Sequence, residues 1–209
     1  MKDLVLHQRR ILGILCILLA PLSLGFGLLG DNAPQWWYSI SATYYANSKM
    51  FMIGLLCCTA LFFFSYRGYD WKDKVATIIA GVSALGVVIF PCECMASSLR
   101  EGLFNLPIKI SNVIHCISAS ILFSDFAFII GYLFPKSNGN PTEEKKKRNL
   151  VYYICCGVIV VFAIWECTFS LVGLPKYWTV INEWVMLTSF GIAWLVKGES
   201  IKFLNDKYL

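Results

Sequence analysis

Charged side chains are scarce in this sequence. Asp, Glu, Lys and Arg make up 15% of its 209 residues, whereas hydrophobic residues make up 57%. A typical soluble domain carries about 25% charged residues. A chain of this length cannot hide so much apolar surface inside a water-soluble core. The composition therefore excludes a soluble domain and predicts an integral membrane protein.

The sequence also lacks the common catalytic signatures. It has two histidines, too few for a membrane hydrolase that holds zinc with three of them. It contains neither a G-x-S-x-G elbow nor an H-E-x-x-H pair. Its nine cysteines are an odd number, and several lie inside apolar runs. This pattern is not typical of a secreted disulfide scaffold, and no cofactor is predicted.

Six apolar stretches are long enough to be membrane-spanning helices, because a helix needs about 20 mostly apolar residues to cross the hydrocarbon layer. The predicted fold class is therefore all-α: a polytopic membrane protein whose single domain, 1–209, is a bundle of six transmembrane helices. The predicted spans are residues 11–29, 50–66, 75–95, 112–134, 150–173 and 178–196.

The distribution of Lys and Arg predicts the orientation of these spans. Fourteen of the 18 basic residues fall in the N-terminal segment, the second and fourth loops and the C-terminal tail. Cytoplasmic segments carry the excess of Lys and Arg, so both termini are predicted to be cytoplasmic in a cell membrane. No Arg-rich segment carries interleaved aromatic residues for base stacking. We therefore expect membrane lipids, and not nucleic acid, as partners.

Ionisable residues within the predicted spans are few, and such residues mark functional sites by default because burying them in lipid is costly. The predicted topology places Glu93, His115, Glu166 and Glu183 near the outer boundary of the membrane. Asp125 lies roughly 15 Å deeper than His115, at 1.5 Å per helical residue. We predict a pocket open toward the outer leaflet, with His115, Glu166 and Glu183 as its principal polar groups.

The first outer loop adds hydroxyl groups at the same level. Residues 36–45 are rich in Trp, Tyr, Ser and Thr, and they hold more hydroxyl groups than an aromatic anchor at the interface requires. We predict that this loop folds back over the bundle and that Ser39, Ser41, Tyr44 and Tyr45 contact a ligand, with Asp125 as a deeper ligand contact.

Three classes of function are compatible with these residues. The first is a non-catalytic accessory protein that binds a lipid or another amphipathic ligand. The second is an intramembrane lipid-modifying enzyme, in which His115 acts as the base and Glu166 and Glu183 assist it. The third is a pore, transporter or effector, as a homo-oligomer or with a membrane partner protein, in which Asp125 lines the path.

Cysteines near the outer boundary leave two further chemistries open. Cys92, Cys94 and His115 offer thiolate and imidazole ligands for a metal ion, although C-x-C spacing alone is a weak indication. Alternatively, two of Cys92, Cys94, Cys116 and Cys167 form a disulfide, since all four are predicted near the outer side.

Four short motifs lie near the predicted outer boundary of the membrane. They are Ser39-Ile40-Ser41 leading into Phe51, Phe90-Pro91, His115 followed by Ser118-Ala119, and Glu183-Trp184. Together they resemble a superfamily of six-span membrane proteins that includes the DRAM-like and Frag-like proteins and bacterial relatives of unknown function. Relatives often carry an acidic residue after the Ser-Ile-Ser element, where this chain has Ala42-Thr43. The resemblance implies a six-helix bundle and, for some members, a role in lipid-anchor handling or membrane stress.

Overall fold

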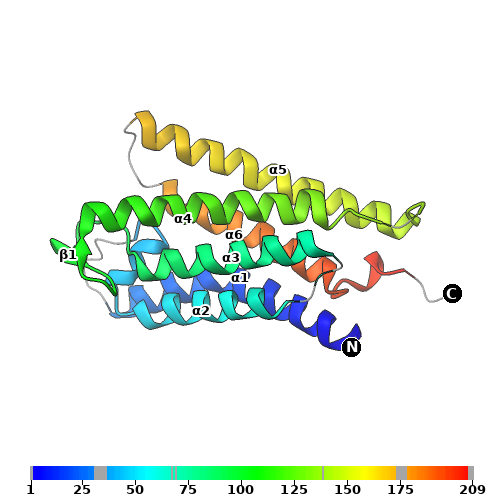
Figure 1. The fold of residues 1–209 in the computed structure, drawn as a ribbon, viewed down its shortest axis with the longest axis horizontal. Coiled ribbons are helices and arrows are strands. Elements are labelled where there is room, and N and C mark those ends of the chain that lie inside the picture. Colours follow the sequence, from blue (N-terminus) through cyan, green and yellow to red (C-terminus); the bar gives the residue numbers. More distant parts are fainter. Residues whose placement is uncertain are drawn as a thin grey trace.

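The apolar stretches form helices that lie side by side and alternate in direction (Figure 1). The computed structural model describes residues 2–30, 37–66, 68, 70–137, 139–172 and 178–206. Within them the α-helices are α1 (Lys2–Gly30), α2 (Lys49–Ser65), α3 (Trp71–Ile89), α4 (Ile108–Phe128), α5 (Glu143–Val172) and α6 (Thr179–Lys197). The shorter elements are the 3-10 helices η1 (Ser41–Tyr45) and η4 (Lys202–Leu204), the π-helix η2 (Ile129–Leu133) and the strands β1 (Arg100–Glu101) and β2 (Leu106–Pro107).

The two ends of the bundle differ in what they carry. At one end α1 begins and α6 ends, and we call it the terminal end; β1 lies at the opposite end, which we call the hairpin end (Figure 1). There β1 pairs with β2 in antiparallel orientation. Because the helices alternate in direction, the first turns of α2, α4 and α6 lie at the hairpin end. α5 diverges from the other helices toward that end (Figure 1).

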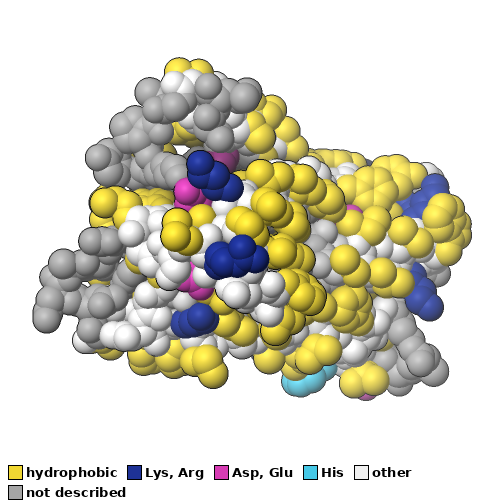
Figure 2. All heavy atoms as spheres, turned by 60° about the vertical axis from the view of Figure 1, so that its left-hand side comes forward, with side chains coloured by type: hydrophobic (Ala, Val, Ile, Leu, Met, Phe, Trp, Pro, Cys, Tyr) yellow, Lys and Arg dark blue, Asp and Glu magenta, His cyan; other side chains and the backbone are white. Residues whose placement is uncertain are grey.

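Four helical segments are long and apolar enough to cross a membrane: Asp3–Leu29, Ile108–Leu133, Glu143–Phe169 and Thr179–Lys197. α2 is apolar but shorter, with 17 residues. Large hydrophobic side chains on α4 and α5 are exposed, and hydrophobic groups cover much of the surface visible in Figure 2, with Lys and Arg in a few separate places. An apolar flank of this kind is stable in lipid and not in water. The all-helical, membrane character predicted from the sequence is therefore confirmed.

The third helix differs from its predicted span, 75–95, at both ends. It begins at Trp71 because Asp70 caps it: the Asp70 side chain accepts hydrogen bonds from the backbone N–H groups of Lys72 and Asp73, and the Asp73 side chain accepts one from the Asp70 backbone N–H. It ends at Ile89 because Pro91 disfavours helical backbone at the residue before it. Residues 36 and 173, which bound the predicted loop and the fifth predicted span, lie outside the described residues.

Two features of the packing hold the helices in place. Aromatic rings from α2, α4 and α6 fill the core, where Phe126 stacks on Phe190 with ring centroids 3.5 Å apart and Phe63 and Trp194 pack beside them. α1 and α6 approach closely at a pair of glycines: a Cβ added to Gly13 would lie 2.8 Å from the carbonyl oxygen of Gly191. Small residues at a helix crossing allow such close contact in membranes.

Candidate functional site

The Glu183 carboxylate and the Ser39-Ile40-Ser41 segment meet at the hairpin end, although about 140 residues separate them. The Ser39 hydroxyl donates to both carboxylate oxygens at 3.1 and 3.0 Å, the Ile40 backbone N–H donates at 2.5 Å and the Ser41 hydroxyl at 3.1 Å. Glu183 projects from the second turn of α6, and the loop turns back through η1 to reach it. The carboxylate therefore fastens the loop to the bundle.

Glu166 is satisfied by neighbours on the following helix. Its two carboxylate oxygens accept hydrogen bonds from the Thr179 hydroxyl at 2.7 Å and the Asn182 side-chain amide at 2.5 Å. Asn182 is buried and directly precedes Glu183 in α6. Glu166 thus ties the end of α5, the helix that diverges most, to the start of α6.

His115 caps the end of α3. Its Nδ1 lies 2.8 Å from the carbonyl oxygen of Phe90 and 3.2 Å from that of Val87, so it carries the proton and donates it to these oxygens. The last carbonyls of a helix have no partner within the helix, and the imidazole supplies one. The Ser39 and Ser41 hydroxyls donate to Glu183 instead of to His115. The structure therefore places the serines at Glu183 and His115 at the end of α3.

The two tyrosines of the loop, Tyr44 and Tyr45, also make contacts at the hairpin end. The Tyr45 hydroxyl donates to the carbonyl oxygen of Cys92 at 2.8 Å, and burial raises the pKa of that hydroxyl. Tyr44 is buried, and the Lys49 ammonium lies 3.8 Å from its ring centroid as a cation–π contact. Glu93 is exposed, and its backbone N–H donates to the Asn112 side chain at 2.8 Å.

The cysteines of this region are not linked to one another in the structure. None of the nine cysteines, all of which are described, is in a disulfide, so the disulfide considered from the sequence is not formed in the structure. Burial raises the pKa of the Cys92 thiol, and the nearby Glu183 carboxylate raises it further; a thiol of this kind is a weak metal ligand. Among the described residues, no group of three or more His, Cys, Asp or Glu side chains is placed to hold a metal ion. Cys92, Cys94 and His115 thus do not form a metal centre here.

Asp125 lies apart from the hairpin end and remains unsatisfied. It is buried on α4, and its Oδ2 has no hydrogen-bond partner among the described residues. Two shallow grooves of about 400 Å³ meet at Asp125 and Phe128. The first is lined otherwise by Ser120, Ile121 and Ser124, and the second by Trp71, Lys72, Val75, Ala76, Ile79 and Tyr132. We call the two together the Asp125 groove.

The backbone around the Asp125 groove is irregular. Four residues beyond Asp125 the α-helix changes to the π-helix η2, and π-helical turns frequently occur at functional sites. The sequence singled out Asp125 but not its partners. Ser120 and Ser124 are spaced by four residues and so share a helix face with each other, and Asp125 directly follows Ser124 in the sequence. Trp71 and Lys72 fell outside the predicted third span, so nothing in the pattern placed them beside Asp125.

Comparisons of the chain with models of protein families, with curated proteins and with solved structures gave no match.

Proposed function

We propose that this chain is a six-span protein of the cell membrane that binds an amphipathic, lipid-like ligand in the Asp125 groove without transforming it. The observation that carries the proposal is Asp125, a residue that lines an otherwise mostly apolar groove and whose buried Oδ2 has no hydrogen-bond partner among the described residues. A buried acceptor without a partner is costly. A ligand that supplies a donor at this point removes that cost, and its apolar part covers the groove.

The chemistry of the groove defines the ligand class. Ile79, Phe128 and Ile121 offer apolar contact, and the Ser120 and Ser124 hydroxyls add polarity near Asp125. Lipid pockets combine apolar walls with a few polar groups that fix orientation. The ligand is therefore an apolar chain or ring system that carries a hydroxyl or ammonium donor.

The membrane arrangement supports entry of such a ligand from the lipid. Asp125 lies eight residues before the end of η2 at Leu133, roughly 12 Å along the helix axis. With six spans and cytoplasmic termini, as the distribution of Lys and Arg favours, this position is in the cytoplasmic half of the bilayer. The site is thus deeper than the outer pocket expected from the sequence. We prefer it because the polar residues at the hairpin end bind one another.

A pair of photoreactive probes tests the proposal. One is a long-chain alcohol that carries a diazirine and an alkyne, and the other is its methyl ether, which has no donor. We expect the alcohol to label peptides that contain Phe128 or Ile79 about tenfold more efficiently than the ether, since a hydrogen bond to a charged group contributes about 1.5–3 kcal/mol. In Asp125→Leu, which keeps the volume and removes the acceptor, the two probes should label equally.

The matched control is Thr168→Val, a change at an exposed residue of α5 whose hydroxyl bonds the carbonyl oxygen of Ile164 in its own helix. It should retain the preference for the alcohol. Equal labelling of the unmodified chain by both probes, or a preference that survives Asp125→Leu, would contradict the proposal.

A further inference from the structure

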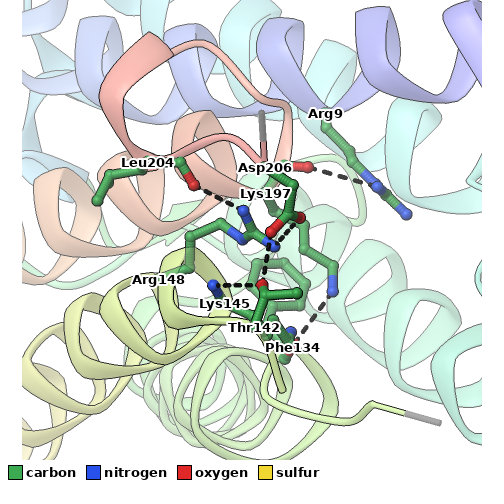
Figure 3. A network of polar contacts seen from close by, with 8 residues as sticks. All are labelled: Arg9, Phe134, Thr142, Lys145, Arg148, Lys197, Leu204 and Asp206. Atoms are coloured by element: carbon green, nitrogen blue, oxygen red, sulfur yellow. Dashed lines mark hydrogen bonds and ion pairs between the residues drawn. The ribbon is translucent and has the colours of Figure 1, made fainter. Parts of the chain in front are cut away.

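Four cationic side chains from three separate parts of the sequence meet at the terminal end (Figure 3). Arg9 comes from α1, Lys145 and Arg148 from the start of α5, and Lys197 from the end of α6. The ammonium groups of Lys145 and Lys197 both donate to one backbone oxygen, the carbonyl of Phe134, at 2.8 and 3.1 Å. Arg9 reaches the same place by donating to the carbonyl oxygen of Lys197 at 3.4 Å.

Two carboxylates lie among these cations. Arg148 Nη2 is paired with Asp206 at 2.7 Å, and Asp73 acts electrostatically on Lys197. Among the described residues, these four cations against two carboxylates leave an excess of positive charge. Arg9 and Asp73 are both only 6% exposed, so water screens the repulsion among the cations less than it does at an open surface.

An anion that accepts hydrogen bonds from several of these cations offsets that repulsion. We propose that Arg9, Lys145, Arg148 and Lys197 form a binding site for a phosphate group, which we call the phosphate site. Phosphate oxygens accept several charge-assisted hydrogen bonds at once, and Arg and Lys are the side chains that supply them. Basic pockets between membrane helices bind phosphate-bearing headgroups in this way. The site is separate from the Asp125 groove and does not depend on the function proposed for it.

Membrane topology alone does not explain the convergence. Orientation requires basic residues near the cytoplasmic flank and no particular meeting of their side chains. Lys146 and Lys147 meet that requirement: both are exposed, and Lys146 pairs with Glu143 at 2.7 Å on its own helix. Lys145, directly before them, is half-buried and reaches the Phe134 carbonyl from a different helix. The chain therefore contains its own matched control for the proposal.

The test uses the full chain, purified in detergent and stripped of lipid. Inorganic phosphate is titrated against sodium chloride at equal ionic strength while the melting temperature is followed. In parallel, the chain is reconstituted in vesicles of phosphatidylcholine with or without phosphatidic acid. It is then released from the vesicles, and native mass spectrometry detects the lipid that stays bound. The test variant is Lys145→Gln with Lys197→Gln, which removes two charges and keeps amide donors. The control is Lys146→Gln with Lys147→Gln.

We expect phosphate or phosphatidic acid to bind the unmodified chain and the control with equal affinity. The affinity of the test variant should be lower by about tenfold or more. Without phosphate, the test variant should melt no lower than the unmodified chain, because repulsion is removed. Binding of phosphatidic acid alone identifies a lipid headgroup as the source, and binding of both identifies the phosphate group itself. Absence of binding to the unmodified chain, or equal weakening in both variants, overturns the proposal.

Discussion

Replacing Glu183 with alanine should release the loop that precedes α2. In the folded chain one carboxylate accepts all the hydrogen bonds that join Ser39, Ile40 and Ser41 to α6. Ser39 and Ile40 are 5% and 3% exposed, so water cannot replace the lost acceptor without movement of the loop. Alanine provides no acceptor, and the donors become unsatisfied unless the loop opens.

The expected cost follows from these donors. A buried donor left without a partner costs about 1–3 kcal/mol. The Ser41 hydroxyl is only half-buried and can turn toward water, whereas the Ile40 N–H and the Ser39 hydroxyl cannot. We therefore expect Glu183→Ala to lower the free energy of loop opening by about 2–4 kcal/mol. Glu183→Gln keeps one carbonyl oxygen and should lose roughly half as much.

Thiol labelling measures this opening once the direct effect of the Glu183 charge on the Cys92 thiol is separated from it. Glu183→Gln removes the same charge but keeps an acceptor for the loop, so any excess labelling in Glu183→Ala over Glu183→Gln reports opening. Loop residues Ala42 and Ala46 pack against Cys92 and Cys94, so opening of the loop exposes both thiols. In Glu183→Ala the rate at which a maleimide modifies Cys92 should rise by about 30-fold or more, which is the kinetic equivalent of 2 kcal/mol. Peptide mass spectrometry separates this thiol from the eight others.

Two comparisons make the result specific to the loop. Cys116 is already exposed, and its labelling rate should stay unchanged as an internal reference. Glu93→Ala removes an exposed carboxylate at the same end of the bundle and should leave the labelling of Cys92 as it was. If Cys92 reacts in Glu183→Ala at the rate of the unmodified chain, the carboxylate does not hold the loop and the reasoning is refuted.

Two further predictions concern packing and topology. Gly13→Ala should lower the free energy of unfolding by about 1–3 kcal/mol in chemical denaturation, because its added Cβ meets the backbone of α6. The control Gly54→Ala should leave that free energy unchanged, because a Cβ there meets nothing within 4 Å. An equal loss in both variants would show that the close crossing of α1 and α6 is unimportant. A membrane-impermeant amine reagent applied to intact cells should modify the exposed Lys109 and spare the exposed Lys146. The reverse pattern would place the termini outside.

Several elements could be predicted from the sequence because the membrane imposes simple requirements. The thickness of the hydrocarbon layer demands apolar runs of about 20 residues, so α2 and α6 lie within one residue of their predicted spans at both ends. α1 and α5 begin nine and seven residues before their predicted spans, because their first turns are polar and hydropathy does not include them. The third helix differs from its predicted span at both ends, because its start depends on the capping by Asp70 and its end on Pro91. Asp70 and Pro91 act on the residues next to them, so they set the ends of a helix without changing the hydropathy of the span.

The partners of the polar residues were decided by tertiary structure. Glu166, Glu183 and His115 all lie at the hairpin end, and the alternating direction of the helices was enough to predict that they share one end of the bundle. It did not show that Glu183 holds Ser39 or that His115 caps α3, because those bonds depend on which helix faces which.

The two sites proposed here have the same origin in the tertiary structure. Hydropathy and charge counts report how deep a residue lies and on which side of the membrane. They carry no information on rotation about a helix axis or on neighbours far away in the chain. Only the packing of α3 on α4 gives Asp125 its groove, and only the meeting of α1, α5 and α6 turns basic residues that set topology into a cluster around Phe134.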